Sequence, residues 1–145
     1  RLPGTSFDCI TLWHVLEHLH KPSDYAFEIK RLLKPGGICI AALPNSSSHD
    51  AMHYMKDWAA WDVPRHLWHF NPDTLSIFAE KEGFVIINTV PLPLDVFYIS
   101  ALSEKNRRSV MPFMKGIVKG SGFAIKSLFN KERSSSLVYF LRTSD

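Results

Sequence analysis

Residues 7–44 read FDCITLWHVLEHLHKPSDYAFEIKRLLKPGGICIAALP, and this stretch decides the fold class. The apolar run from Phe7 to Leu12 is typical of a buried strand, and Ile38 to Leu43 is a second one. Between them Ser23 can cap a helix, and Lys34-Pro35-Gly36-Gly37 stops it. Apolar side chains recur at helical spacing in that helix, at Ala26, Ile29, Leu32 and Leu33. Strand, helix and strand form a βαβ unit with parallel strands and a right-handed crossover.

The rest of the chain continues the α/β pattern. Asn71 caps a further helix with Pro72 in its first position, and Gly83 ends it. The apolar stripe of this helix is Leu75, Phe78 and Ala79. Two further strands follow, at 84–90 and 137–141. We therefore expect an α/β sheet of too few strands to look complete, interrupted by inserts at 46–70 and 95–133.

Composition favours a globular protein. The chain has 145 residues, 46% of them hydrophobic and 21% charged, and no apolar run of the roughly 20 residues that span a bilayer. Cys9 and Cys39 lie in apolar strand-like segments, where cysteines are usually buried. Two such cysteines make neither a disulfide framework nor a zinc site, so we expect a cytoplasmic protein.

The positive charge is concentrated in the last third. Residues 1–90 carry 8 Lys and Arg against 10 Asp and Glu, a balance of −2, whereas residues 91–145 carry 9 against 4, a balance of +5. The basic stretch 95–133 is amphipathic, which suits a membrane-surface helix, an anionic substrate or RNA, or an ordinary helical cap with a solvated basic face. Gly116, Gly120 and Gly122 argue against one long rigid helix within it.

Topology places a site at the carboxyl ends of the first two strands, because ligands of open parallel sheets bind there. These ends are Leu12-Trp13-His14 and Pro44-Asn45. The insert 46–70 leaves directly from Asn45 and is rich in Trp, His and Arg. We expect this insert to lie over the strand ends as a lid.

Several motifs in order resemble the class I, Rossmann-like, S-adenosylmethionine-dependent methyltransferases, in particular the group with the ubiquinone-biosynthesis O-methyltransferases. They are Phe7-Asp8-x-Ile10, His14-Val15-Leu16-Glu17-His18, Leu33-Lys34-Pro35-Gly36-Gly37, Pro44-Asn45, and Pro64-Arg65-His66-Leu67-Trp68-His69-Phe70 followed by Glu82-Gly83-Phe84. The match covers residues 5–90 well and the remainder by topology.

The resemblance implies a seven-stranded sheet whose last strand is antiparallel, of which residues 1–145 supply strands four to seven. The glycine-rich loop after strand one and the acidic residue after strand two are not found here, and the seven glycines include no Gly-x-Gly-x-Gly. We therefore expect the carboxyl-terminal portion of one methyltransferase domain, with weak or absent cofactor binding by this portion alone.

By the same resemblance, the loop after strand four runs beside S-adenosylmethionine, which makes Leu12, Trp13, His14 and His18 the candidate cofactor-binding residues. The ring of Trp13 can face the adenine or the sulfonium, or can pack on the following helix. His14, Glu17 and His18 stand at i, i+3 and i+4, so they are weak candidates for a metal site. The favoured alternative is that Glu17 and His18 hold the loop by hydrogen bonds.

The insert supplies the candidate acceptor residues. His66 is the candidate base, because histidine titrates near neutrality, and Arg65 can form a fork with an acidic group. Trp61, His69 and Asn45 complete the expected substrate-binding set. The alternative for His66 and His69 is a structural hydrogen bond to the backbone, and the alternative for Trp61 is that it only anchors the insert. We expect methyl transfer to a small-molecule or lipid-like acceptor, with peripheral membrane contact and no nucleic acid. The alternatives are a non-catalytic scaffold module and, third, a metal-dependent hydrolase.

Overall fold

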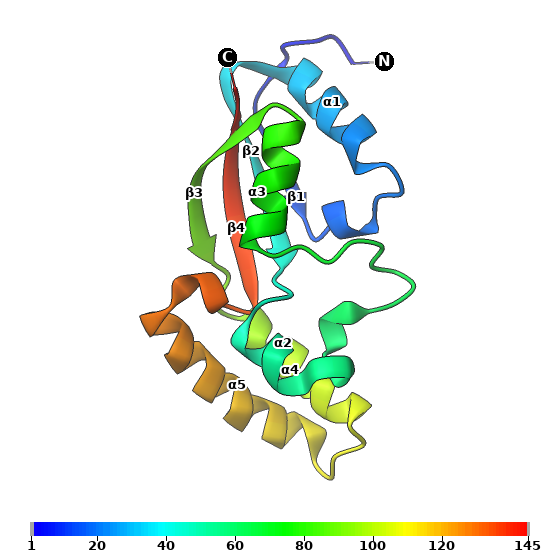
Figure 1. The fold of residues 1–145 in the computed structure, drawn as a ribbon, viewed down its shortest axis with the longest axis vertical. Coiled ribbons are helices and arrows are strands. Elements are labelled where there is room, and N and C mark those ends of the chain that lie inside the picture. The colour runs from blue at the N-terminus through cyan, green and yellow to red at the C-terminus, as the bar shows by residue number, and fades with distance from the viewer. Residues whose placement is uncertain (1, 145) are drawn as a thin grey trace.

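The computed structural model describes residues 2–144, and its centre is a mixed four-stranded sheet (Figure 1). The strands are β1 (Phe7–Trp13), β2 (Leu33–Pro44), β3 (Phe84–Pro91) and β4 (Ser136–Thr143), in the spatial order β1-β2-β4-β3. β1 and β2 are parallel, whereas β4 runs antiparallel to both β2 and β3. The expected βαβ unit and the antiparallel last strand are therefore confirmed.

Two helices cover one face of this sheet. They are α1 (Pro22–Leu32), which makes the crossover from β1 to β2, and α3 (Pro72–Lys81), which leads into β3. Alternate strand residues, including Cys39, Ala41 and Leu141, pack with Ala26 of α1 and Leu75 of α3 in one apolar core. We call the strands with these two helices the sheet region.

The capping residues expected from the sequence mark the starts of these helices, with one exception. Asn71 caps α3 as expected, because its side chain accepts from the Thr74 N–H at 2.8 Å. The Thr74 hydroxyl in turn accepts from the Asn71 N–H at 2.9 Å, which completes a capping box. Ser23 does not cap α1: the cap position is Lys21, Pro22 is the first helical residue, and the Ser23 hydroxyl donates to Glu82 of the neighbouring segment at 2.7 Å. A tertiary partner has thus taken the hydroxyl that the sequence offered as a cap.

The two cysteines differ. Cys39 faces the core, where burial raises the pKa of its thiol to about 12, as expected for an inert thiol. Cys9 is exposed, because it points to the opposite face of β1, and the expectation that both are buried is wrong. Strand β2 also starts earlier than expected, at Leu33, and its pairing with β1 shifts register between Phe7 and Cys9.

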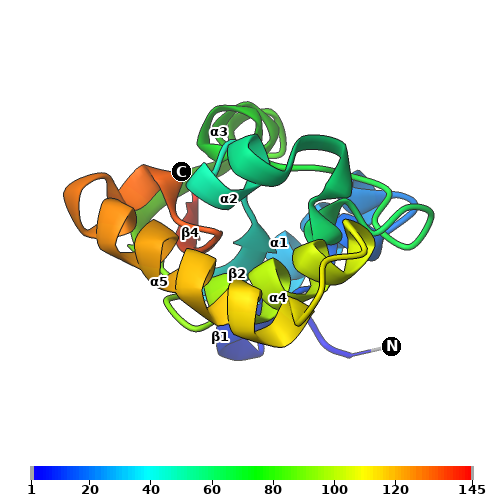
Figure 2. The ribbon, with the colours of Figure 1, turned by 90° about the horizontal axis from the view of Figure 1, so that it is seen from below.

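The remaining segments gather below the carboxyl ends of β1 and β2 (Figure 2). They comprise α2 (His49–Tyr54), the 3₁₀ turns Met55–Asp57 and Ala59–Trp61, α4 (Asp95–Asn106), α5 (Pro112–Phe129) and the 3₁₀ turn Lys131–Arg133. We call residues 46–71 and 92–135 the cap region. It has its own core: Ala51, Tyr54, Trp58, Ala60, Val96, Ile99 and Phe123.

Within the cap region α4 and α5 pack tightly on each other. A Cβ on Gly116 would lie 2.4 Å from the Cα of Ala101, so only glycine permits this approach. Gly120 lies against Phe97, and nothing stands within 4 Å of a Cβ on Gly122. The basic stretch is not one long helix, as expected, but the glycines are not the cause: α5 runs through all three, and the break falls at residues 107–111. Among residues 2–144, no helix is both long and apolar enough to cross a membrane.

Candidate functional site

A cavity of about 300 Å³ opens where the strand ends of the sheet region meet the cap region. It is lined by His14 and Pro44 of the strand ends, Ala59, Ala60, Asp62, Arg65 and His66 of the insert, and Asp95, Tyr98, Ile99 and Leu102 of α4. This is the edge at which parallel sheets bind ligands. The larger cavity, about 820 Å³, lies between α4 and α5 away from the strand ends, so the 300 Å³ cavity is the candidate for chemistry.

His14 ties the strand end to α4. Its backbone N–H donates to the Ala42 carbonyl at 3.0 Å, and its φ of 51° turns the chain sharply after β1. The ring then reaches two carboxylates: Nε2 lies 3.0 Å from Asp95 Oδ2, and Nδ1 lies 3.3 Å from Glu17 Oε1. Hydrogen bonds to Asp95 first and Glu17 second raise the pKa of His14 to about 9. His14 is therefore a cation at neutral pH and holds the two halves of the site together.

The loop after β1 also anchors the insert. The Glu17 carbonyl accepts from the backbone N–H of Leu67 at 2.8 Å and of Trp68 at 3.3 Å. His18 Nδ1 donates to the Arg65 carbonyl at 2.9 Å, and the Trp68 indole donates to the Leu19 carbonyl at 2.8 Å. The loop-holding alternative for Glu17 and His18 thus has direct geometric support.

His66 has the geometry of a proton acceptor. Nδ1 lies 2.7 Å from the Ala60 carbonyl, and because a carbonyl only accepts, Nδ1 carries the hydrogen. In the neutral ring Nε2 then keeps its lone pair, and the nearest carboxylate oxygen, Asp62 Oδ2, lies 3.9 Å away, beyond hydrogen-bond distance. The side chain is only 11% exposed and lines the cavity, and its ring stands edge-on to His18 at 4.6 Å between centroids.

Glu17, His18 and His66 form the one cluster of metal-ligand type among the described residues. One donor atom from each lies within 4.8 Å of the others, and Glu17 Oε2 is buried without a hydrogen-bond partner. Two imidazoles and a carboxylate suit a divalent transition metal. His14 is not in this cluster, because both its nitrogens face carboxylates. A lone pair bound to a metal cannot take a proton, so the two uses of His66 exclude each other.

The other expected residues are placed as follows. Asn45 is 1% exposed, and its amide is bonded within the chain, donating to the carbonyls of Glu132 and Ser134 at 2.8 and 2.9 Å. His69 and Trp61 bond to backbone carbonyls, at Trp61 and Met55 respectively. Arg65 forks onto Asp62 at 2.7 Å on the cavity rim. Trp13, the last residue of β1, is 54% exposed, and Leu12 is half-buried beside the core.

Sequence reasoning did not single out the residues that α4 contributes to the cavity wall, among them Asp95 and Tyr98. They lie in the basic stretch 95–133, for which contact with an anionic substrate was one alternative and no individual site residue was named. Asp95 is the first residue of that helix, and its carboxylate is half-buried against His14. Burial is the largest single influence and works to raise its pKa, but hydrogen bonding from His14 and Ser136 together with the charge of His14 outweighs burial and lowers the pKa. An acidic residue at a helix start usually signals only dipole compensation, so the pattern alone could not single it out.

The fold and site define a Rossmann-like methyltransferase half-sheet, and the comparisons agree. A family model described as a methyltransferase domain matches residues 2–89, and the chain belongs to this family. A probable S-adenosylmethionine-dependent methyltransferase of Mycolicibacterium smegmatis is 28% identical over 110 residues, covering 74% of this chain and 38% of that protein.

Solved structures show the same fold at low identity. A SAM-dependent methyltransferase from Thermotoga maritima superposes with a TM-score of 0.61 at 16% identity, covering 99% of this chain and 59% of that one. One from Archaeoglobus fulgidus gives 0.54 at 17% identity, covering 99% and 62%. A Haemonchus contortus phosphoethanolamine N-methyltransferase solved with S-adenosyl-L-methionine gives 0.51 at 16%, covering 99% and 34%. The chain therefore spans less than two thirds of the length of these relatives.

Proposed function

We propose that the complete protein transfers a methyl group from S-adenosylmethionine to a small-molecule or lipid-like acceptor bound in the 300 Å³ cavity. The observation that carries this proposal is the tautomer of His66: the Nδ1 hydrogen goes to the Ala60 carbonyl, so Nε2, 3.9 Å from the Asp62 carboxylate, keeps its lone pair in a side chain that lines the cavity. The motifs that resemble the ubiquinone-biosynthesis O-methyltransferase group support an oxygen acceptor.

The chemistry requires little of the protein beyond alignment and one proton acceptor. The lone pair of an acceptor hydroxyl attacks the methyl carbon in line, the carbon–sulfur bond breaks, and its electrons remain on sulfur as a thioether. The acceptor proton passes to His66 Nε2. Burial of His66 and coverage by the insert, which acts as a lid, exclude water from the reacting atoms.

We further propose that Leu12, Trp13, His14 and His18 line the cofactor side, while Arg65, Trp61 and His69 shape the acceptor side, with Asn45 as a brace beneath it. Trp13 supports this division, because this last residue of β1 is 54% exposed and its ring can lie on a cofactor. Free thiols at Cys9 and Cys39 support a cytoplasmic location, where cysteines stay reduced.

The sheet itself supports the proposal that these residues are the carboxyl-terminal portion of one domain. Parallel strands are normally covered on both faces, yet only one face of this sheet carries helices among residues 2–144. On the opposite face Cys9 and Val85 are exposed, and Ile40 and Phe140 are only partly buried. β1 is moreover an edge strand with apolar residues on it. Further strands and helices on this edge and face would complete the core.

Two measurements test the proposal. By calorimetry, S-adenosylhomocysteine should bind weakly or not at all to residues 1–145 and tightly to a longer form; tight binding by residues 1–145 alone would overturn the view that the missing part carries the cofactor. Upstream codons that encode a strand followed by Gly-x-Gly-x-Gly support the enzyme, whereas a genuine start near Arg1 would favour a scaffold module.

The role of His66 has its own test. In the complete enzyme, His66→Gln should lower kcat by roughly 10²–10⁴-fold with little change in cofactor affinity, while the matched change His69→Gln should have a much smaller effect. We expect no stoichiometric divalent metal and full activity in a chelator. If one bound ion per chain is found and the chelator abolishes activity, His66 is a ligand with Glu17 and His18, and the proton-acceptor role is wrong.

A further inference from the structure

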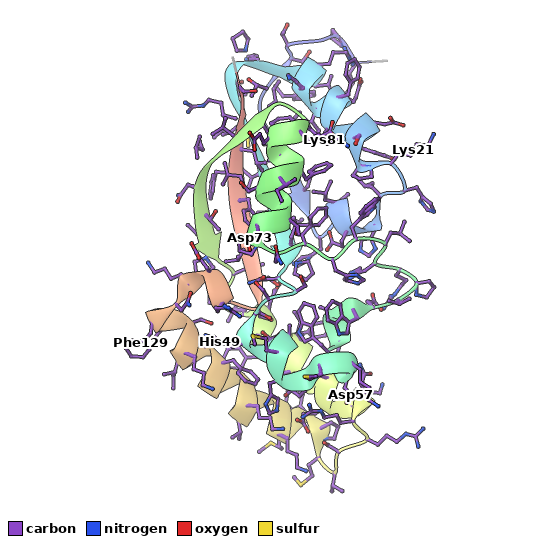
Figure 3. The ribbon with its side chains drawn as sticks, viewed as in Figure 1. Lys21, His49, Asp57, Asp73, Lys81 and Phe129 are labelled. Carbon is purple, nitrogen blue, oxygen red and sulfur yellow. The ribbon has the colours of Figure 1, made fainter. Side chains whose placement is uncertain are left out.

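The outward surface of α5 is largely apolar. Seven of its large side chains are exposed, and Phe129, Leu128 and Val118 are the most exposed at 89%, 75% and 70%. The full set, which we call the α5 face, is Phe113, Met114, Ile117, Val118, Ile125, Leu128 and Phe129. Phe129 projects from the outer edge of the molecule in Figure 3. Lys115 and Lys126 are exposed as well, so the helix presents the solvated basic face that was one alternative and, beside it, a larger apolar one.

The arrangement follows from which residues α5 buries. Gly116, Gly120 and Phe123 are buried toward α4 and the cap core, so the small residues take the inward side. At about 100° per residue the α5 face covers an arc of about 160°. Lys115, Lys119 and Lys126 occupy the sector directly beside this arc. The helix thus has three stripes: inward, apolar and basic.

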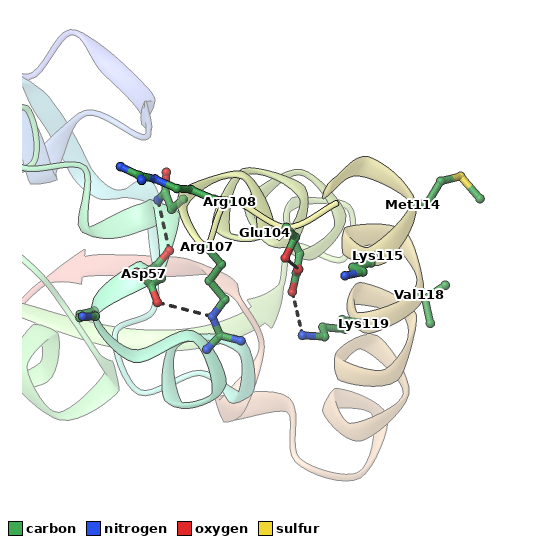
Figure 4. A pocket seen from close by; sticks show the side chains of 11 residues that line it. Asp57, Glu104, Arg107, Arg108, Met114, Lys115, Val118 and Lys119 are labelled. Carbon is green, nitrogen blue, oxygen red and sulfur yellow. Dashed lines mark hydrogen bonds and ion pairs between the residues drawn. The ribbon is translucent and has the colours of Figure 1, made fainter. Parts of the chain in front are cut away.

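The charge of the surface next to the α5 face indicates which kind of partner it suits. Asp57 and Glu104 are the acidic residues of the neighbouring 820 Å³ cavity, and each is paired within the chain, with Arg107 Nε at 3.5 Å and Lys119 Nζ at 2.7 Å (Figure 4). The same cavity also carries Lys56, Arg108 and Lys115, which have no acidic partner among residues 2–144. The surface that adjoins the α5 face is therefore positive and suited to anionic headgroups.

We propose that α5 lies in the interface of an anionic membrane, with the α5 face among the acyl chains and the lysine stripe at the headgroups. An exposed apolar surface of this extent marks an interaction site, and a basic flank favours a lipid surface over a neutral partner. The close packing of α5 on α4 at Gly116 holds the helix in this orientation.

Docking in this way would bring the candidate site to lipid. α4 carries Asp95 and Tyr98 of the 300 Å³ cavity on the same rigid pair of helices. A third cavity of about 230 Å³, mostly apolar, continues from the α5 face at Ile125 and Leu128 toward Pro91 and Pro93. It can hold part of an acyl chain. The proposed docking rests on the α5 face alone. The idea that docking gives the site access to a lipid-like acceptor rests on the proposed methyl transfer.

Vesicle sedimentation tests the docking on the full chain. Vesicles of phosphatidylcholine with 30% phosphatidylglycerol should bind the protein, and pure phosphatidylcholine vesicles should bind it at least tenfold more weakly. The triple variant Val118→Ser, Leu128→Ser and Phe129→Ser should lose at least tenfold in affinity. A matched triple at exposed apolar residues of the sheet region, Phe27→Ser, Ile77→Ser and Val85→Ser, should bind as the parent does. Lys115→Gln with Lys126→Gln should weaken binding about 30-fold at low salt.

Three results would overturn the proposal. One is no binding to the anionic vesicles; another is binding that the α5 triple variant leaves unchanged. The third is a dimer in light scattering that the α5 triple splits, without vesicle binding, which would make the α5 face a contact between copies. Each readout is independent of catalysis, so a failure here leaves the methyl-transfer proposal standing, and loss of methyl transfer leaves the docking standing.

Discussion

The sheet region and the cap region are held together by different interactions. The core of the sheet region is built of aliphatic and aromatic side chains from the strands, α1 and α3. The cap region buries polar groups beside its apolar ones: Ser48, Asp50, Ser100, Ser103, Glu104, Ser134 and Ser135. Asp50 accepts from the Trp58 indole at 2.8 Å and from the Ser135 hydroxyl at 2.7 Å, and joins the two inserts. Because a buried hydrogen bond needs its partner in place, the two bonds to Asp50 Oδ2 favour one arrangement of the cap over the strand ends.

The sheet region should show the largest loss of stability. Leu43, near the carboxyl end of β2, belongs to the sheet core and is 1% exposed, so Leu43→Ala should lower the free energy of unfolding by about 3 kcal/mol through lost burial and a cavity. Urea denaturation measures it. An equal loss from Val85→Ala, on the exposed face, would contradict the view that the core lies on one face only.

The contact between α4 and α5 should be the next most sensitive. Gly116→Ala forces a Cβ to within 2.4 Å of the Ala101 backbone and should cost about 2 kcal/mol by overpacking. Gly122→Ala is the matched control in the same helix, and with open space around it should stabilise by about 0.8 kcal/mol through helix propensity. Thermal denaturation of both variants measures the difference, and the same sign for both would show that the packing glycine is not special.

Removing the hydrogen bond between Trp58 and the buried Asp50 should have a local effect in the cap region. Trp58→Phe removes the indole donor to the buried Asp50 carboxylate and should cost about 2 kcal/mol. Hydrogen exchange should show faster exchange in residues 46–61 and little change in the strands. Uniformly faster exchange would mean that the two regions unfold as one unit.

The smallest expected effect is the pH dependence of the contact that His14 makes with Asp95 and Glu17. The folded-state pKa of His14 is raised to about 9, so its stabilisation is complete below about pH 6.5 and is lost as the pH rises through 9. After allowance for the exposure of the ring, the loss should be about 1 kcal/mol between pH 6.5 and 9.5. His14→Gln should flatten this part of the stability profile, and a variant that keeps the slope would assign it to another group.

Much of the sheet region was predictable because its signals are local. Apolar runs marked all four strands, and Asn71 with Pro72 marked the start of α3, since capping and turn preferences act within a few residues. The sequence also indicated that the strand ends and the insert with His66 meet, because parallel strands place their carboxyl ends at one edge.

The tertiary structure alone decided which distant side chains meet. Three features depend on packing between segments far apart in the chain. They are the ion pair of His14 with Asp95, the hydrogen bond from the Ser23 hydroxyl to Glu82, and the choice of which side of α5 faces inward. An amphipathic pattern shows that a helix has two sides but not which side the neighbouring helix covers. In α5 the glycine side packs closest to α4, and that choice leaves the bulky apolar side facing outward.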